Sequence, residues 1–444
     1  MTRRPGWQLG LLLIGYPVWW LLGVVPFALL FVTVSLALEL RRRPIRLPPG
    51  FSLWLLFVVW AGLGILVVQS NAPLAVEGLN PNRYLTWGLR LFYYLLATVV
   101  LLYVVNIRDR ATFHRVLTAF GWMFVWIVAG GLLGTLLPSV DFPSLIELAL
   151  PYGLTGNAYV HSLIHPNLVE HVLLTGSARP SAPFPFANVW GLNFACFLPC
   201  FVRSWIGSPS HRRRAVGVVV LALSVVPVIT SLNRGLWLAL AAAVVTVVIR
   251  LAFERQAGLL IGTVGAIAVA AVLLAVTPLS GVISARLASD HNSNQGRVEL
   301  ATRGFTSTLA SPVVGYGTAR NVQGSLVSIA GGATSSCPRC SPPSFGTQGQ
   351  LYLVTFTTGY VGGAFYIGFV LLMLLRASRI RGPDVTMASA ILVMHLVTMI
   401  VYSADNLAIL PIFLALGVIG HELRLRQPRG APRAPWAVRA LTAR

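Results

Sequence analysis

Lysine is absent from this 444-residue chain, and acidic residues are scarce. The 33 basic residues are therefore all arginines, and with only 12 aspartates and glutamates they give a formal net charge of +21. Charged residues make up 10% of the chain, whereas 56% of it is hydrophobic and the mean hydropathy is +0.76. No soluble domain of this length approaches such a composition. The sequence therefore predicts an all-α integral membrane protein.

Several motifs that would identify other protein classes are missing. There is no Walker A phosphate loop and no Gly-x-Gly-x-x-Gly following a strand, so an ATP-driven pump is not indicated. There is also no Asp-x-Asp pair of the kind that holds a divalent metal on a sugar nucleotide. If the substrate carries a diphosphate, arginine guanidinium groups must supply the positive charge instead.

Cysteine is rare as well, with four in the whole chain. Cys196 and Cys200 lie one helical turn apart in an apolar run, which indicates packing. Cys337 and Cys340 lie in a polar segment expected on the outer face, where a disulfide is one option. A zinc site is not indicated by the cysteines, because only one Cys-x-x-Cys motif occurs.

Twelve apolar runs can be drawn as candidate transmembrane helices. They cover residues 8–21, 24–40, 51–69, 84–106, 115–137, 183–205, 215–232, 235–250, 258–279, 349–375, 385–402 and 406–423. The first two are short, but arginines at 3–4 and at 41–43 both mark cytoplasmic ends. Residues 8–40 should therefore cross twice, with a break near Gly23 and Pro26. Both termini are then cytoplasmic.

The arginines are distributed unevenly over this topology. The cytoplasmic segments carry 24 arginines against five acids, whereas the outer loops carry eight against seven. The basicity is thus mainly a topology signal, and a nucleic-acid partner is not expected. The basic tail, residues 424–444, is expected to lie on anionic membrane lipid at the cytoplasmic side. We expect a multi-pass protein of the inner (plasma) membrane.

Two outer segments, residues 138–182 and 280–348, are much longer than a helical hairpin needs. The whole chain, 1–444, is interpreted as a single polytopic membrane domain, and function is expected in these two loops. The second loop contains a helix-like piece at about 296–309 and a run rich in Gly, Ser and Pro. A loop of that length typically folds as a lid over a cavity.

Arg234 is the one charged residue between Ala215 and Ile249. These 35 residues would form a helix of about 52 Å, too long for a hydrocarbon core of about 30 Å, so Arg234 should lie at a turn between two spans. An arginine at such a turn is a candidate for binding an anion. The alternative is an arginine that extends from a helix end toward water.

Four outer-face segments then follow in a fixed order. Arg179 precedes a span entered through prolines, and Arg234 lies in Ser-Leu-Asn-Arg-Gly. Arg297 comes ahead of the turn Ser-Pro-Val-Val-Gly-Tyr-Gly at 311–317, and Thr-Gln-Gly-Gln-Leu-Tyr-Leu at 347–353 is followed by Gly-Tyr-Val-Gly-Gly at 359–363. Over residues 175–425 this series resembles the O-antigen ligase and O-antigen polymerase family of bacterial envelope glycan assembly.

The resemblance implies a GT-C-like membrane glycosyltransferase with about twelve transmembrane helices. It implies a metal-independent, inverting enzyme without a cofactor, working on the outer face. The donor would be an undecaprenyl-diphosphate-linked glycan, and the acceptor a hydroxyl of a glycan or glycolipid. Arg179 and Arg234 match arginines of the family motif and are assigned to the diphosphate, where preorganised cations stabilise the leaving group.

The other catalytic residues are less certain from the sequence. Arg297 is either a third arginine on the diphosphate or the partner of Glu299 and Asp290 in folding the lid. Family ligases have a histidine as the proposed base where this chain has Gln348, and glutamine can position a hydroxyl but cannot take its proton. Asp405, at the last outer turn, matches an acidic position of the family and is the first substitute.

Further candidates are weaker, and other functions stay open. They are Arg90, His165, Glu170 and His291 near the reacting groups, and Trp190 for stacking on a sugar. The missing histidine favours a polymerase over a ligase. A flippase or transporter of a lipid-linked or anionic substrate is the main alternative, although no internal repeat and no acid at mid-membrane depth support it. A non-enzymatic scaffold of an envelope complex also stays open.

Overall fold

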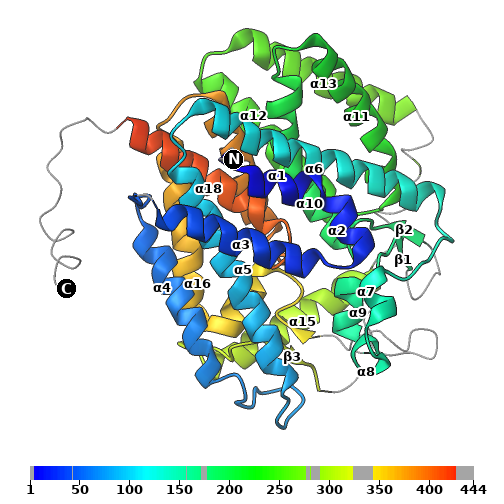
Figure 1. Ribbon diagram of the computed structural model, residues 1–444, viewed down its shortest axis with the longest axis vertical. Coiled ribbons are helices and arrows are strands. Elements are labelled where there is room, and N and C mark those ends of the chain that lie inside the picture. The colour runs from blue at the N-terminus through cyan, green and yellow to red at the C-terminus, as the bar shows by residue number, and fades with distance from the viewer. Residues whose placement is uncertain are drawn as a thin grey trace, which may run out of the picture.

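The computed structural model describes residues 5–42, 44–156, 158–171, 178–276, 281, 291–323 and 344–426. Figure 1 shows a bundle of helices with a small group of shorter elements at its lower right. The strands of the described part form two sheets of two strands each. The predicted all-α membrane class agrees with this architecture.

The helices of the first half alternate with short turns. They are α1 (Trp7–Ile14), α2 (Tyr16–Leu22), α3 (Val25–Arg41), α4 (Phe51–Leu63) with a 3-10 turn at Gly64–Leu66, α5 (Asn82–Val105) and α6 (Arg110–Leu136). The first long loop follows. It contains α7 (Leu145–Ala149), α8 (Tyr152–Thr155), α9 (Ala158–Ile164), β1 (Val169–His171) and β2 (Ala178–Pro180).

The second half returns to long helices. They are α10 (Ala187–Phe201) with a π-helical turn at Val202–Ile206, α11 (His211–Thr230), α12 (Arg234–Phe253) and α13 (Ala257–Val276). The second long loop contributes α15 (His291–Leu309), β3 (Arg320–Asn321) and β4 (Ser344–Phe345). The chain then continues through α16 (Gln350–Ala377), α17 (Pro383–Thr398) and α18 (Ile409–Leu425).

Each of the twelve predicted apolar runs overlaps helix within the described residues, although residues 8–21 form two short helices, α1 and α2. Within the described residues, six helices are long and apolar enough to cross a membrane, namely α5, α6, α10 with its π-helical turn, α11, α12 and α16. Two shorter apolar helices, at Phe51–Leu66 and Pro383–Thr398, accompany them. The break expected near Gly23 is present, since Gly23 has φ 76° and separates α2 from α3. Twelve crossings with both termini inside stay a prediction.

Aromatic side chains fill the centre of the bundle between α4, α5, α16 and α18. Trp54 is 1% exposed and packs on Phe413 with ring centroids 4.6 Å apart. Phe57 makes edge contacts with Tyr94 at 4.8 Å and with Tyr366 at 5.1 Å. In a bilayer, helices associate by such close packing, because lipid is as apolar as the side chains themselves. This aromatic centre therefore holds α4, α5, α16 and α18 together.

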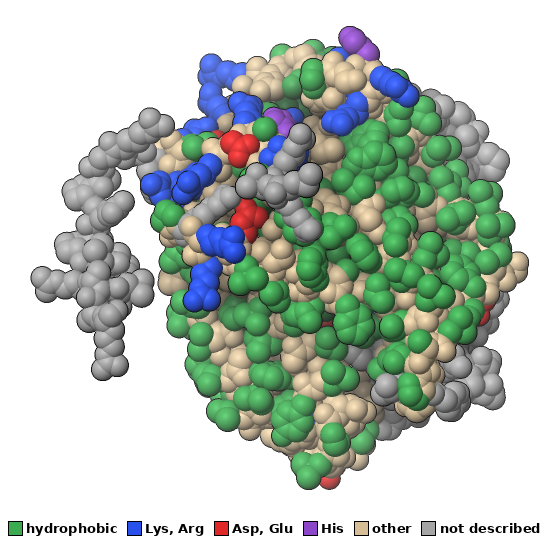
Figure 2. All heavy atoms as spheres, in the orientation of Figure 1, with side chains coloured by type: hydrophobic (Ala, Val, Ile, Leu, Met, Phe, Trp, Pro, Cys, Tyr) green, Lys and Arg blue, Asp and Glu red, His purple; other side chains and the backbone are tan. Residues whose placement is uncertain are grey.

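The loops predicted to be cytoplasmic meet one another at one end of the bundle. Arg203 forms an ion pair with Asp384 at 2.7 Å, and Arg424 donates to the carbonyl oxygen of Ile107 at 3.2 Å. Arg250 donates to the carbonyl oxygen of Ala377 at 2.8 Å. In Figure 2 the arginines gather at the upper left, whereas most of the visible face is hydrophobic. The bundle thus has a basic end and an apolar flank suited to lipid.

The loops predicted to be outside meet at the other ends of the same helices. Arg320 is 2% exposed and donates to the carbonyl oxygen of Val68 at 2.7 Å, which joins the second long loop to the segment after α4. Ser144 in the first long loop lies against Gly23, where an added Cβ would approach its Oγ to 2.3 Å. These contacts join loops that the sequence assigns to the same side of the membrane.

Helix α16 is broken at Gly359, where the backbone has φ 67° and ψ −179°. The turn at 311–317 fills the break with main-chain hydrogen bonds. The amide of Tyr316 donates to the carbonyl of Phe356 at 3.0 Å, and the amide of Tyr360 donates to the carbonyl of Pro312 at 2.7 Å. The groups freed by the break are therefore paired inside the protein, as a membrane helix requires.

Candidate functional site

Arg179 lies on a short antiparallel hairpin beside the turn that joins α11 to α12. It is opposite Glu170 in the pairing of β1 with β2. Its Nε donates to the carbonyl oxygen of Ser231 at 2.8 Å, which fastens the hairpin to the turn between α11 and α12. Its two terminal nitrogens make no hydrogen bond to the described residues. They remain available to an anion in the planar fork that suits phosphate oxygens.

Arg234 is the first residue of α12, directly after the cap residue. Asn233 caps the helix, since its side chain accepts a hydrogen bond from the amide of Leu236 at 3.1 Å and donates to the carbonyl of Ala187 at 3.0 Å. A helix N-terminus carries partial positive charge, so an arginine there adds charge of the same sign and is not favourable for the helix. Both features attract an anion to this point.

Arg297, on α15 of the second long loop, lies near both of these arginines. Burial lowers the pKa of Arg297, and the positive charges of Arg179 and Arg234 lower it further, while Tyr402 and Glu170 act in the opposite direction. Burial likewise raises the pKa of Tyr402 to about 12, against the effects of Arg297, Arg179 and a hydrogen bond to Asn233. Three arginines from three separate segments thus interact electrostatically in one place.

The alternative in which Arg297 pairs with Glu299 to fold the lid is wrong. Glu299 forms its ion pair with Arg303, one helical turn further along α15, at 2.5 Å. Arg297 forms no ion pair with any residue that the structure describes, and Asp290 lies outside the described residues. The charge of Arg297 therefore interacts with two other arginines and with the carboxylate of Glu170, without an ion pair to any described residue.

Asp405 lies in the loop between α17 and α18 and faces Arg90 of α5. The Oδ2 of Asp405 is 3.6 Å from the Nε of Arg90, with the side chains 26% and 11% exposed. Arg90 also donates to the hydroxyl of Thr318 at 3.3 Å. The first candidate for the base and a secondary candidate therefore form one ion pair. The same loop carries Tyr402, which interacts electrostatically with Arg297 and Arg179. The loop therefore lies beside both the ion pair and the arginines.

The glutamine that contacts this loop is Gln350 rather than Gln348. The side-chain Oε1 of Gln350 accepts a hydrogen bond from the backbone amide of Ala404 at 2.7 Å. The backbone amide of Gln350 donates to the carbonyl oxygen of Tyr402 at 2.7 Å. Gln348 is half-buried, and its Nε2 donates to the neighbouring Thr347 at 3.1 Å. Both glutamines belong to the motif at 347–353, and the role of Gln348 stays a prediction.

Two of the secondary candidates have structural roles. Trp190 is fully buried and donates from its indole nitrogen to the carbonyl of Ile127 at 3.0 Å, so stacking on a sugar is wrong for this residue. Glu170 accepts a hydrogen bond from the amide of Ala187 at 2.8 Å, which stabilises the beginning of α10. The side chain of His291 and both Cys337 and Cys340 lie outside the described residues.

Arg320 is bound by main-chain carbonyl oxygens through its two terminal nitrogens. Arg320 donates to the carbonyls of Thr318 at 2.8 Å and Tyr316 at 2.9 Å, in addition to that of Val68. Burial lowers the pKa of Arg320 to about 10, with smaller contributions from other arginines. Because its terminal nitrogens bind carbonyl oxygens of the protein, Arg320 has a structural role. The contrast separates Arg320 from Arg179 and Arg297.

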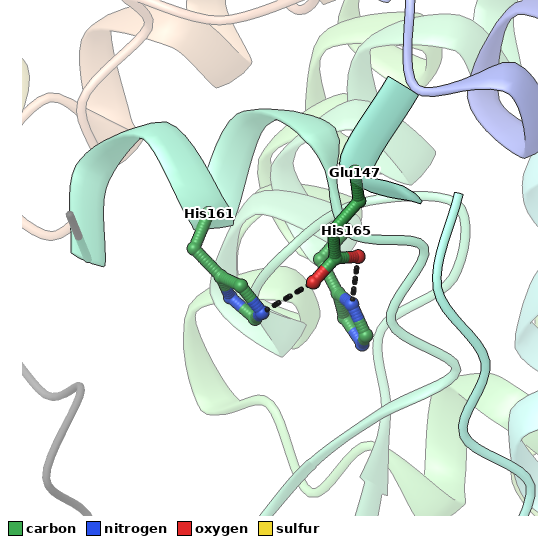
Figure 3. A group of neighbouring side chains, drawn as sticks. All are labelled: Glu147, His161 and His165. Atoms are coloured by element: carbon green, nitrogen blue, oxygen red, sulfur yellow. Dashed lines mark hydrogen bonds and ion pairs between the residues drawn. The ribbon is translucent and has the colours of Figure 1, made fainter. Parts of the chain in front are cut away.

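The remaining candidate, His165, belongs to a separate group with Glu147 and His161 (Figure 3). Among the residues that the structure describes, these three side chains form a group that could hold a metal ion. The sequence interpretation missed the group. The signal that could have found it is the spacing of His161 and His165, since histidines four residues apart lie on the same side wherever the chain is helical.

No protein-family model and no curated protein matches this chain.

Proposed function

We propose that this chain is a membrane glycosyltransferase of the outer face of the inner membrane. It transfers or polymerises a glycan from a polyprenyl-diphosphate-linked donor onto an acceptor hydroxyl, with a polymerase favoured over a ligase. The observation that carries the proposal is the proximity of Arg179, Arg234 and Arg297. Segments more than fifty residues apart bring these three charges together, near Tyr402.

Three guanidinium groups in one partly buried place repel each other, and an anion that contacts them relieves this repulsion, as the carboxylate of Glu170 does for Arg297. A diphosphate carries more than one negative charge and several oxygens, so it can accept hydrogen bonds from more than one arginine. Arg234 adds the positive end of α12 to the same point. The cluster is therefore suited to a lipid diphosphate at the bilayer surface better than to a singly charged headgroup.

In the proposed reaction the acceptor oxygen forms a bond to the anomeric carbon of the donor. The bond from that carbon to the diphosphate oxygen breaks, and the electron pair leaves with the diphosphate. Preorganised cations lower the barrier because negative charge grows on this leaving group. The acceptor proton passes to a base, for which Asp405 is the candidate carboxylate. Arg90 and the Gln350-bound backbone hold the position of Asp405.

A first experiment measures binding of the leaving group alone. The full-length chain in detergent is titrated with geranylgeranyl diphosphate, geranylgeranyl monophosphate and geranylgeraniol. We expect the diphosphate to bind most tightly, Arg234→Ala to weaken it by at least about tenfold, and Arg234→Lys to restore it only in part because the fork is lost. Arg303→Ala is the matched control, since Arg303 is an outer arginine of α15 paired with Glu299.

A second experiment measures chemistry. The protein is mixed with a polyprenyl-diphosphate oligosaccharide and a glycan acceptor, and elongated glycan and released lipid diphosphate are quantified. We expect Arg234→Ala to lower turnover by roughly 10²- to 10³-fold, the loss typical of removing one preorganised donor from a developing anion. Unchanged turnover in Arg234→Ala contradicts the assignment of the leaving-group site. Diphosphate binding without any release would indicate a flippase or transporter instead.

A further inference from the structure

Four side chains of the first long loop come together in a second group. Asp141 precedes α7, Glu147 lies on α7, His161 lies on α9, and His165 follows α9 directly. The amide of His165 donates to the carbonyl of His161 at 2.9 Å, so the helical turn continues to His165. Residues four apart on a helix lie on the same side, and both imidazoles therefore face Glu147.

The contacts in this group are short and converge on one carboxylate, as Figure 3 shows. The Nε2 of His161 is 3.2 Å from one oxygen of Glu147, and the Nδ1 of His165 is 2.7 Å from the other. The two imidazole rings are stacked with centroids 4.5 Å apart. One possible ligand atom from each of the three residues lies within 4.8 Å of the others. These side chains are 10–16% exposed, so they are partly shielded from water.

We propose that Glu147, His161 and His165 bind a divalent transition-metal ion, for which zinc is the best match. Two imidazoles and one carboxylate are a ligand set that zinc takes in proteins, with a fourth position for water. Ligand atoms around tetrahedral zinc lie about 3.3 Å apart, given bonds of about 2.0 Å. The contacts of Glu147 with the two histidines are within several tenths of an ångström of that spacing.

Asp141 supplies a second feature of such a site. Its Oδ1 is 2.7 Å from the Nε2 of His165, the ring nitrogen that faces away from Glu147. A histidine that binds a metal usually donates its other ring N–H to a carboxylate, which fixes the tautomer and orients the ring. Asp141 is 79% exposed and is therefore an outer partner of His165 rather than a fourth buried ligand.

The metal would reinforce contacts that already join parts of the loop. It links α7 to the end of α9, four residues before β1 (Val169–His171), the strand that pairs with β2 (Ala178–Pro180). The proposal does not depend on the proposed function, because metal binding is measured without donor or acceptor.

The test uses the full-length protein in detergent, purified through an affinity tag without histidine and treated with a chelator. After dialysis against zinc, we expect about one zinc per chain by elemental analysis, and saturable binding by titration calorimetry. Cobalt in place of zinc should give the visible absorption of a four-coordinate site. His161→Ala and Glu147→Gln should each abolish stoichiometric binding. His171→Ala is the matched control, since His171 is an exposed histidine of the same loop.

A third variant separates metal binding from folding. Asp141→Asn removes no ligand and changes an exposed side chain, so the protein should elute normally on size exclusion while zinc affinity falls by roughly 10- to 100-fold, as for other outer-shell partners. Wild-type protein that takes up no stoichiometric zinc, cobalt, nickel or manganese overturns the proposal, as does equal binding in His161→Ala and His171→Ala. The four side chains would then form only a hydrogen-bonded group.

Discussion

The ion pair between Arg90 and Asp405 allows structural and catalytic roles of a carboxylate to be separated by a double-mutant cycle. Asp405 is the candidate base, but its contact with Arg90 also holds the α17–α18 loop against α5. Asp405→Asn and Arg90→Gln each remove one charge, the first without a change in side-chain size, and the double variant removes both. Stability should depend on whether the charges are matched, whereas turnover should stay low in every variant that lacks Asp405.

The expected size of the stability effect follows from the geometry. At 3.6 Å and an effective dielectric constant of about 20, the Coulomb attraction is about 4.6 kcal/mol before desolvation is subtracted. The distance is longer than a charge-assisted hydrogen bond, and exposures of 11% and 26% leave both groups partly solvated. We therefore expect each single variant to lose about 1–3 kcal/mol of unfolding free energy, and a coupling energy of about 1–2 kcal/mol.

The measurements are the unfolding free energy in mixed detergent micelles and turnover with a polyprenyl-diphosphate oligosaccharide. The double variant should be more stable than the two single losses predict by addition. Its turnover should nevertheless stay as low as that of Asp405→Asn, about 10²- to 10⁴-fold below wild type, because removal of Arg90 does not restore a base. If the double variant recovers turnover together with stability, Asp405 only balances Arg90 and is not the base.

Two further predictions concern the scaffold around the arginines. Gly235→Ala should destabilise the protein by about 1–3 kcal/mol in thermal unfolding, because the new Cβ would lie 2.3 Å from the hydroxyl of buried Tyr402. The control, Gly62→Ala, places its Cβ in open space and should be neutral or slightly stabilising. Glu170→Ala should lower the unfolding free energy by about 1 kcal/mol, because the hydrogen bond that caps α10 is lost. Glu299→Ala removes only an exposed ion pair within a helix and should lower it by no more than about 0.5 kcal/mol. Equal losses in the two variants would contradict the capping role of Glu170.

The helices could be predicted from the sequence because hydropathy and backbone breakers act locally. Every apolar run overlaps helix within the described residues, and Gly23 separates α2 from α3 through a positive φ that glycine adopts easily. The partner of Glu299 was also within reach of the sequence. Residues two apart point to different sides of a helix, so Arg297 could not face Glu299, whereas Arg303 at the fourth position could.

The site residues that were missed depend on contacts between distant segments. Burial of Trp190 is decided by the packing of α10 on α6, and no local pattern reports which face of an apolar helix turns inward. The choice of Gln350 over Gln348 depends on where the α17–α18 loop passes. The approach of Glu147 to His165 depends on how the irregular loop between them folds back.

The filled break in α16 restricts which sequences this fold can accept. At Gly315, with φ 69°, an added Cβ would lie 2.5 Å from the amide nitrogen of Gly359, and at Gly359 an added Cβ would lie 2.5 Å from the backbone of Val313. Both glycines are in the left-handed region and both touch main chain, which cannot move aside as a side chain can. In a saturation library, these two positions should therefore tolerate glycine alone, while neighbouring residues such as Val313, which meet the break through backbone atoms, should accept many side chains.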